Sequence, residues 1–229
     1  NEIMALTDKV TVMRQGEIVG DKNTKDTTKD QLAEMMVGRS VLLRIDKKKP
    51  NIGDTVFEVK NINVKDNLDV MRVKNVSFDL KKGEILGIAG VTGNGQTELL
   101  EALSGICQID SGEIKLHGKI ISSKKIFAGP RQLREQDVAH VPEDRQRMGL
   151  VTEFNASENL IFGYHHQQPF SKSSVMMGKN IFNHSKKIMQ DYDVRPQSPF
   201  LLTSNFSGGN QQKIILSREL NKDPKVLLV

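Results

Sequence analysis

The stretch of sequence that decides the fold runs Gly90-Val91-Thr92-Gly93-Asn94-Gly95-Gln96-Thr97-Glu98. A short apolar run, Glu84–Ala89, precedes it between two glycines and predicts a buried parallel strand. After it, apolar residues recur at helical spacing from Thr97 to Leu103, and Gly105 suits a helix C-cap. The order of strand, glycine-rich loop and helix therefore predicts an α/β fold.

This order is also the setting in which the pattern G-x-x-x-x-G-K-[ST] holds phosphate. Its glycines let successive N–H groups point inward, and the N-terminus of the helix adds roughly half a positive charge. Thr97 stands where the hydroxyl of that pattern meets Mg²⁺, but Gln96 occupies the lysine position. Taken alone, these residues leave two alternatives open: a phosphate-binding loop, or a glycine turn that packs a helix on a strand.

Composition narrows the class of protein. The chain has 229 residues and a net charge of 33 − 28 = +5, with acidic residues interleaved almost everywhere, which favours a solvated surface over a nucleic-acid footprint. No apolar run approaches the ~20 residues that a membrane span needs, and we expect no signal peptide from the first residues of this sequence. Cys107 is the only cysteine, which excludes an intrachain disulfide and favours a reducing compartment.

The first part of the chain reads as pieces without a core of their own. The pattern predicts the end of a helix at residues 1–6 and two strands joined by a turn at residues 9–14 and 18–20. An amphipathic helix is predicted at residues 28–37, with Thr28 as its N-cap and Gly38 as its stop. We interpret residues 1–46 as the C-terminal tail of a preceding domain. The polar stretch 47–54, with three lysines, Pro50 and Gly53, predicts a linker.

From residue 55 onward the pattern is that of one domain. Strands are predicted before the glycine loop at residues 56–61 and 76–80, and after it at residues 111–118 and 137–142. A helix at 211–220 and a last apolar strand at 225–229 follow. From Asn155 to Asp193 the sequence is helical in pattern and polar. Within it His165, His166 and His184 are expected on the surface, and Met176 and Met177 are expected to pack inside.

Two further motifs follow the loop: Pro142-Glu143-Asp144-Arg145 and Phe206-Ser207-Gly208-Gly209-Asn210-Gln211-Gln212-Lys213. In this order the three resemble the nucleotide-binding domain of ABC transporters. The last string is similar to the signature sequence of that family, with Phe206 where leucine is usual. The resemblance decides in favour of a phosphate-binding loop. It implies a P-loop NTPase fold with an antiparallel β-subdomain and a helical signature subdomain at about 151–222, within a second nucleotide-binding domain at 55–229.

The resemblance also implies a function. Tandem ATP-binding subunits of this type drive bacterial importers of simple sugars and nucleosides, using ATP and Mg²⁺. Residues 90–98 would bind ATP, with Thr97 and Glu143 at the metal. Ser207, Gly208, Gly209, Asn210 and Gln211 would contact, in trans, the ATP that the other nucleotide-binding domain holds.

Three departures qualify this expectation. Gln96 removes the ammonium that would hold the β- and γ-phosphates. No aromatic residue lies at Val70–Val73, where the family often stacks one on adenine. The catalytic acids of the family are expected beyond Val229, so no catalytic residue is assigned within the chain, and the fragment alone is expected to be inactive.

The expected partners are membrane-spanning permease subunits, the other nucleotide-binding domain of the same subunit and, indirectly, an extracellular substrate-binding lipoprotein, but no nucleic acid. The expected location is the cytoplasmic face of the plasma membrane. Two rival functions stay open: a soluble ABC ATPase acting on ribosomes or DNA, and a nucleotide-regulated interaction module without catalysis. The transported substrate cannot be read from these residues.

Overall fold

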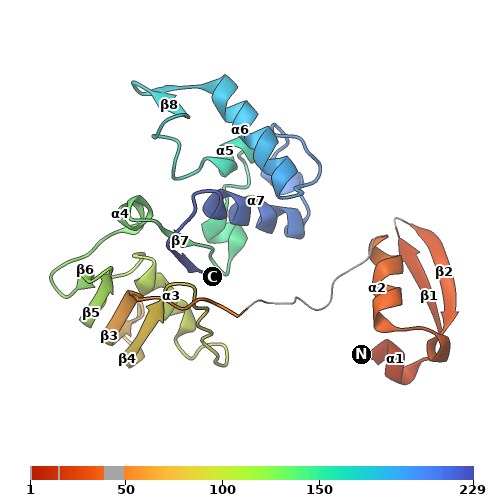
Figure 1. The fold of residues 1–229 in the computed structure, drawn as a ribbon, viewed down its shortest axis with the longest axis horizontal. Helices are drawn as coiled ribbons and strands as arrows, with labels where there is room; N and C mark the ends of the chain where they lie inside the picture. Colours follow the sequence, from red (N-terminus) through yellow and green to blue (C-terminus); the bar gives the residue numbers. More distant parts are fainter. Residues whose placement is uncertain (1, 15, 39–48) are drawn as a thin grey trace. The chain divides into compact units, whose positions relative to one another are not determined.

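The structure, a computed structural model, describes residues 2–14, 16–38 and 49–229 (Figure 1). The chain divides into two compact units, residues 1–49 and 50–229. Part of the predicted tail and the first two residues of the predicted linker fall at 39–48, outside the described residues.

The first unit is a small hairpin with helices. It comprises α1 (Glu2–Leu6), β1 (Lys9–Arg14), β2 (Glu17–Asn23), a 3₁₀ helix (Thr24–Asp26) and α2 (Lys29–Val37), with β1 and β2 antiparallel. The predicted caps of α2 are confirmed: Thr28 and Gln31 form a capping box, and Gly38 closes the helix in the left-handed region at φ 78°. Among the described residues of this unit, Val12 and Leu32 are the buried apolar side chains.

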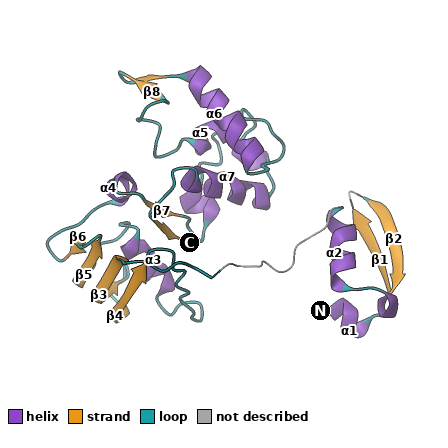
Figure 2. Ribbon diagram, in the orientation of Figure 1, coloured by secondary structure: helices purple, strands orange, loops and turns teal. Residues whose placement is uncertain are grey.

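The second unit begins with a four-stranded antiparallel sheet in the order β4-β3-β5-β6 (Figure 2). Its strands are β3 (Thr55–Lys65), β4 (Met71–Lys81), β5 (Ser111–Leu116) and β6 (Lys119–Ser123). Alternating residues of β3, among them Phe57 and Val59, turn into the core, as a half-buried strand requires. Helix α3 (Gln96–Leu103) contributes Leu99, Ala102 and Leu103 to the same core.

A parallel pair of strands completes that core. β7 (Val138–His140) lies beside β10 (Val226–Leu228), preceded in the chain by α4 (Pro130–Glu135). Val138, Val226 and Leu228 join the cluster formed by the antiparallel sheet and α3. The two strands were both predicted, and they meet although more than eighty residues separate them in the sequence.

The predicted buried strand Glu84–Ala89 is wrong. Residues 84–90 belong to no helix or strand, and the side chains of Ile85 and Ile88 are 77% and 47% exposed. Within the described part of the chain no strand pairs with this stretch. A buried parallel strand depends on hydrogen bonds from a neighbouring strand, and without that partner this apolar sequence forms no strand and its isoleucines stay exposed.

The rest of the unit is mainly helical. It contains a π-helical turn (Arg145–Gly149), α5 (Ala156–Leu160), a short hairpin of β8 (Ser171–Lys172) and β9 (Val175–Met176), α6 (Gly178–Asp191), a 3₁₀ turn (Thr203–Asn205) and α7 (Gly208–Leu220). A second core joins these helices, with Ile188, Met189, Ile214 and Ile215 nearly fully buried. The signature string therefore opens α7, one of the two longest helices in the described residues.

Two expectations about side chains in this helical part are wrong. Met176 and Met177 are 48% and 38% exposed, because Met176 lies in the short hairpin before α6 and Met177 is the N-cap residue of that helix, both outside the helical core. His184 is half-buried, with its ring edge-on to Phe170 at 4.8 Å between centroids, whereas His165 and His166 are exposed as expected.

Candidate nucleotide site

The glycine loop leads directly into α3 through Gly95. Gly95 has φ 97°, and a Cβ placed on it would lie 2.6 Å from the carbonyl oxygen of Arg72, so only glycine fits. No side chain caps the N-terminus of α3. The first N–H groups of the helix are thus left free of intrahelical partners, at the end where the helix dipole favours an anion. This geometry fits the phosphate groups of a nucleotide.

Gln96 turns back onto the loop. Its Nε2 donates to the carbonyl oxygen of Val91 at 3.3 Å and lies against Gly90, where any side chain would collide with it. The backbone N–H of Asn94 donates to the same carbonyl at 3.1 Å. Gln96 therefore closes the loop on itself with a neutral amide, at the position where the pattern supplies a cation.

Thr97 and Glu143 come together in the lining of a cleft. The Thr97 hydroxyl donates to Oε2 of Glu143 at 3.5 Å, although 46 residues separate them in the sequence. Both line a cleft of about 830 Å³ that Glu98 and Arg145 also line. A hydroxyl and a carboxylate are hard oxygen donors of the kind that Mg²⁺ takes, so this pair fits a metal-bound nucleotide.

Asp66 adds a further carboxylate to the same cleft. The backbone N–H of Val70, followed by the Arg72 guanidinium at 2.7 Å, holds the pKa of Asp66 below its ordinary value. Asp66 is therefore an anion near neutral pH, and its partner Arg72 supplies the carbonyl that closely approaches Gly95.

The signature residues form the N-terminus of α7. Ser207 is the N-cap, and its Oγ accepts a hydrogen bond from Nδ2 of Asn210 at 2.9 Å. The Oδ1 of Asn210 in turn accepts from the backbone N–H of Arg195 at 2.8 Å. Gly209 has open space where a Cβ would stand. Asn210 thus fixes the direction of the Ser207 hydroxyl, while the helix N-terminus stays open to a ligand.

Gly208 has a different environment, because Arg145 covers it. A Cβ on Gly208 would lie 2.8 Å from Nη2 of Arg145. One residue after Arg145 and three after Gly208, Nε2 of Gln146 donates to Oε1 of Gln211 at 3.2 Å. The loop that carries Glu143 is therefore joined to the start of the signature helix.

The far end of the helix is joined to the same loop. Nη1 of Arg218 donates to the carbonyl oxygens of Gly149, at 3.0 Å, and Asn159, at 3.3 Å. The carboxylate of Glu219 pairs with Arg218 at 2.8 Å and accepts from the hydroxyl of Tyr164 at 3.0 Å. Burial, with the nearby charge of Glu219, raises the pKa of Tyr164, which stays a hydrogen-bond donor.

Sequence reasoning missed these connections. The sequence gives no signal for the approach of Arg145 to Gly208, because it depends on two segments far apart in the chain. Arg218 does carry a signal: it lies three and four residues after Ile215 and Ile214, on the apolar side of a helix, where an unpaired charge would be costly. No hydrogen bond or ion pair joins residues 90–98 to residues 207–211 in the described part of the chain.

Comparison with known proteins shows the family to which this chain belongs. The model of the ABC transporter family matches residues 73–229. The chain belongs to the ABC transporter family. The match includes the glycine loop, Glu143 and the signature string.

The chain is similar to several import ATP-binding proteins. The chain is 42% identical over 229 residues to the nucleoside import ATP-binding protein NupA of Lactococcus lactis, covering all of this chain and 44% of that protein. It is 38% identical to the guanosine import ATP-binding protein NupO of Bacillus subtilis, over 97% of this chain and 43% of that protein. A ribose import ATP-binding protein, RbsA of Bacillus cereus, is 34% identical, over 100% and 44% of the two chains.

The chain thus spans less than half the length of the curated ABC relatives it matches. Among solved structures, a nucleotide-free ATP-binding cassette from an ABC transporter matches with a TM-score of 0.60 at 19% identity, covering 76% of this chain and 68% of that one. This likeness confirms the predicted fold of an ABC ATPase, with its antiparallel sheet and helices. No helix in the described residues combines the length and the apolar character needed to cross a membrane.

Proposed function

We propose that this chain is part of the ATP-binding subunit of an importer whose substrates are nucleosides. The carrying observation is the 42% identity to a nucleoside import protein over the whole chain, which includes the first unit as well as the family domain. A guanosine import protein follows at 38%, ahead of the ribose protein at 34%. The import names of these relatives favour this function over an ATPase acting on ribosomes or DNA.

In this proposal the subunit acts at the cytoplasmic face of the membrane on permease subunits, which receive substrate from an extracellular binding lipoprotein. ATP would bind with Mg²⁺ at residues 90–98, and Thr97 and Glu143 would hold the metal. The contact between these two side chains, 3.5 Å from oxygen to oxygen, supports the assignment, as does their place on one cleft. Bound Mg²⁺ would neutralise charge on the phosphates, and the chain's own part is to position and orient them.

The test of the substrate class is transport in cells that lack the full-length subunit. Uptake of labelled nucleosides should fall to background and return when the intact gene is supplied. Uptake of ribose should not change. Loss of ribose or glucose uptake, with nucleoside uptake retained, would place the chain among sugar importers instead.

We further propose that the two nucleotide sites of the subunit are unequal. The phosphate loop of this domain has Gln96 in place of the cation, whereas its signature keeps Ser207, Gly208 and Gly209. The working site would then combine this signature with the phosphate loop of the preceding domain. Close backbone approach to the transferred phosphate requires that no side chain intervene, and misplaced N–H donors cost roughly a hundredfold or more in rate.

Steady-state ATPase of the full-length subunit with its permease partners tests this division. Gly208→Asp should nearly abolish turnover, since it adds bulk and a like charge against the γ-phosphate. Gln96→Ala should change turnover only a few-fold. The reverse order of effects would show that the loop of this domain hosts the working site.

A further inference from the structure

The helical part of the second unit contains a long stretch with positive charge only. Residues 159–190 include no aspartate or glutamate, but they include four lysines and three histidines. The same stretch has no arginine; the nearest are Arg147 and Arg195. Residues 114–134 also lack acidic residues, but their charges are spread over β5, β6, the turn after it and α4, and Lys115 and Arg131 form ion pairs with Glu113 and Glu135. In residues 159–190, by contrast, three of the four lysines lie on one helix.

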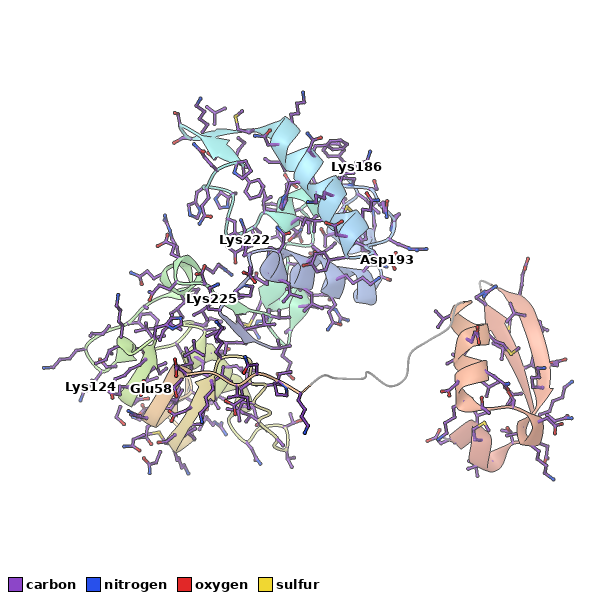
Figure 3. The ribbon with its side chains drawn as sticks, in the orientation of Figure 1. Glu58, Lys124, Lys186, Asp193, Lys222 and Lys225 are labelled. Carbon is purple, nitrogen blue, oxygen red and sulfur yellow. The ribbon has the colours of Figure 1, made fainter. Side chains whose placement is uncertain are left out.

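Three of the lysines share the outer side of α6. Lys179, Lys186 and Lys187 are exposed, and at 100° per residue they fall within an arc of about 100° on the helix. Ser185, Ile188 and Met189 are buried on the other side. Figure 3 marks Lys186 on this helix. In the described residues no ion pair engages any of these lysines.

The hairpin before α6 adds apolar side chains to the same region. Its turn, Ser173 and Ser174, has φ values of 50° and 65°, the left-handed pair typical of a tight two-residue hairpin. Beyond the turn the exposed fraction is 64% for Val175, 48% for Met176 and 38% for Met177. The exposed side chains therefore follow a defined turn and precede the basic helix.

The base of this hairpin is fixed to the core. The N–H of Met177 donates to the carbonyl of Phe170 at 2.8 Å, and the Phe170 side chain is fully buried. Apolar residues on a rigid projection can enter the boundary between headgroups and acyl chains without the entropic cost of ordering a loose loop.

We propose that this surface binds the anionic lipid headgroups of the membrane. We call it the basic face and define it by Lys172, Val175, Met176, Met177, Lys179, Lys186 and Lys187. Clustered lysines are attracted to an anionic leaflet, and adjacent apolar side chains give a second means of attachment. A nucleic-acid partner is disfavoured because the face has no arginine, the residue that best contacts phosphate bidentately, and because its apolar side chains are aliphatic and do not stack on bases.

The face would give the subunit a membrane contact that does not depend on the permease. The experiment therefore uses the purified full-length subunit without permease subunits, so its failure leaves the proposed transport function untouched. Sedimentation with vesicles of phosphatidylcholine alone is compared with vesicles that also contain phosphatidylglycerol. Binding should require the anionic lipid and weaken as salt is raised.

The decisive variant reverses three charges on α6: Lys179→Glu, Lys186→Glu and Lys187→Glu. Each lysine near an anionic surface contributes about fivefold in affinity, so the triple variant should bind about a hundredfold more weakly. The matched control makes the same charge change at Lys22, Lys25 and Lys29, exposed residues of the first unit that alternate with Asp21, Asp26 and Asp30, and should change binding less than about threefold. Val175→Ser with Met176→Ser should weaken binding several-fold while the salt dependence stays.

Four results would overturn the proposal. These are no binding to anionic vesicles, equal binding to both lipid mixtures, an equal loss in the control at Lys22, Lys25 and Lys29, and vesicle binding that the Val175 and Met176 replacements leave unchanged. Tighter binding to single-stranded DNA or RNA than to the vesicles, lost in the same triple variant, would assign the face to nucleic acid.

Discussion

The guanidinium of Arg218 donates to the carboxylate of its chain neighbour Glu219 at 2.8 Å, and the two side chains are 2% and 0% exposed. Such a pair is costly to bury, and here each charge has further partners. Arg218 reaches the carbonyls of Gly149 and Asn159, and Glu219 accepts from Tyr164. The pair therefore connects the end of the signature helix with the loop after Glu143 and with α5.

We expect Glu219→Ala to lower the free energy of unfolding by about 3–5 kcal/mol, because it leaves the Arg218 charge buried without its counterion. Tyr164→Phe should cost about 1–3 kcal/mol through the lost hydrogen bond to Glu219. The comparison is Arg131→Ala, which breaks an exposed pair with Glu135 and should cost less than about 1 kcal/mol. Urea unfolding gives all three values, and similar losses for Glu219→Ala and Arg131→Ala would contradict the expectation.

The approach of Arg145 to Gly208 gives a second prediction, on coupling between the two segments. Gly209→Ala enters open space and should stabilise by up to about 1 kcal/mol through helix propensity. Gly208→Ala should gain less, since the new methyl group must displace the Arg145 guanidinium. In an Arg145→Ala background Gly208→Ala should gain as much as Gly209→Ala, which corresponds to a coupling of about 0.5 kcal/mol or more between positions 145 and 208 in a double-mutant cycle on the free energy of unfolding. Strict additivity would show that Arg145 does not lie over Gly208 in solution.

Contacts of this kind, between segments distant in the chain, could not be predicted from the sequence. Local signals were sufficient for α2, where Thr28 and Gly38 mark the ends, and for α7, where the signature string opens a helix with apolar spacing. They failed for Glu84–Ala89, because an apolar run becomes a parallel strand only when another strand pairs with it. They also failed for Met176, because a short hairpin left exposed what the residue type predicted to be buried.

The candidate site follows the same division. The glycine loop and the signature were identified from order and spacing alone, since each motif is contiguous. The links between segments, such as Arg145 over Gly208 and Gln146 to Gln211, join residues more than sixty positions apart. No pattern in a single sequence shows that residues so far apart in the chain lie together, so these contacts become visible only in the folded structure.

Stability should fall as the pH drops below about 6.5, the ordinary pKa of histidine. Burial, followed by the charges of Lys222 and Lys187, lowers the pKa of His184 in the folded chain. Burial also lowers the pKa of His140. Because the unfolded chain takes up the proton more readily, the stabilising contribution is complete above the unfolded pKa and declines as pH falls towards the folded value.

Unfolding free energies measured at about pH 7.5 and about pH 5.5 test this direction. His184→Gln should reduce the loss on acidification, since one group with a lowered pKa is gone. His165→Gln is the control, because that imidazole is exposed. A loss on acidification that is the same in His184→Gln and wild type would assign the pH dependence to other groups.

Gln96 leads to the last prediction, which concerns affinity for ATP. Its amide is occupied by the Val91 carbonyl at 3.3 Å and carries no charge. Gln96→Lys would place an ammonium at the same point of the loop, where it can reach a phosphate oxygen. A hydrogen bond to a charged group contributes about 1.5–3 kcal/mol, so ATP should bind about ten- to a hundredfold more tightly at this site. Gln96→Met removes the amide without adding charge and should not tighten binding.

Calorimetric titration with ATP and Mg²⁺ measures the affinity of each variant. If the wild-type site binds ATP tightly and Gln96→Ala leaves that affinity unchanged, the loop holds phosphate through its backbone alone.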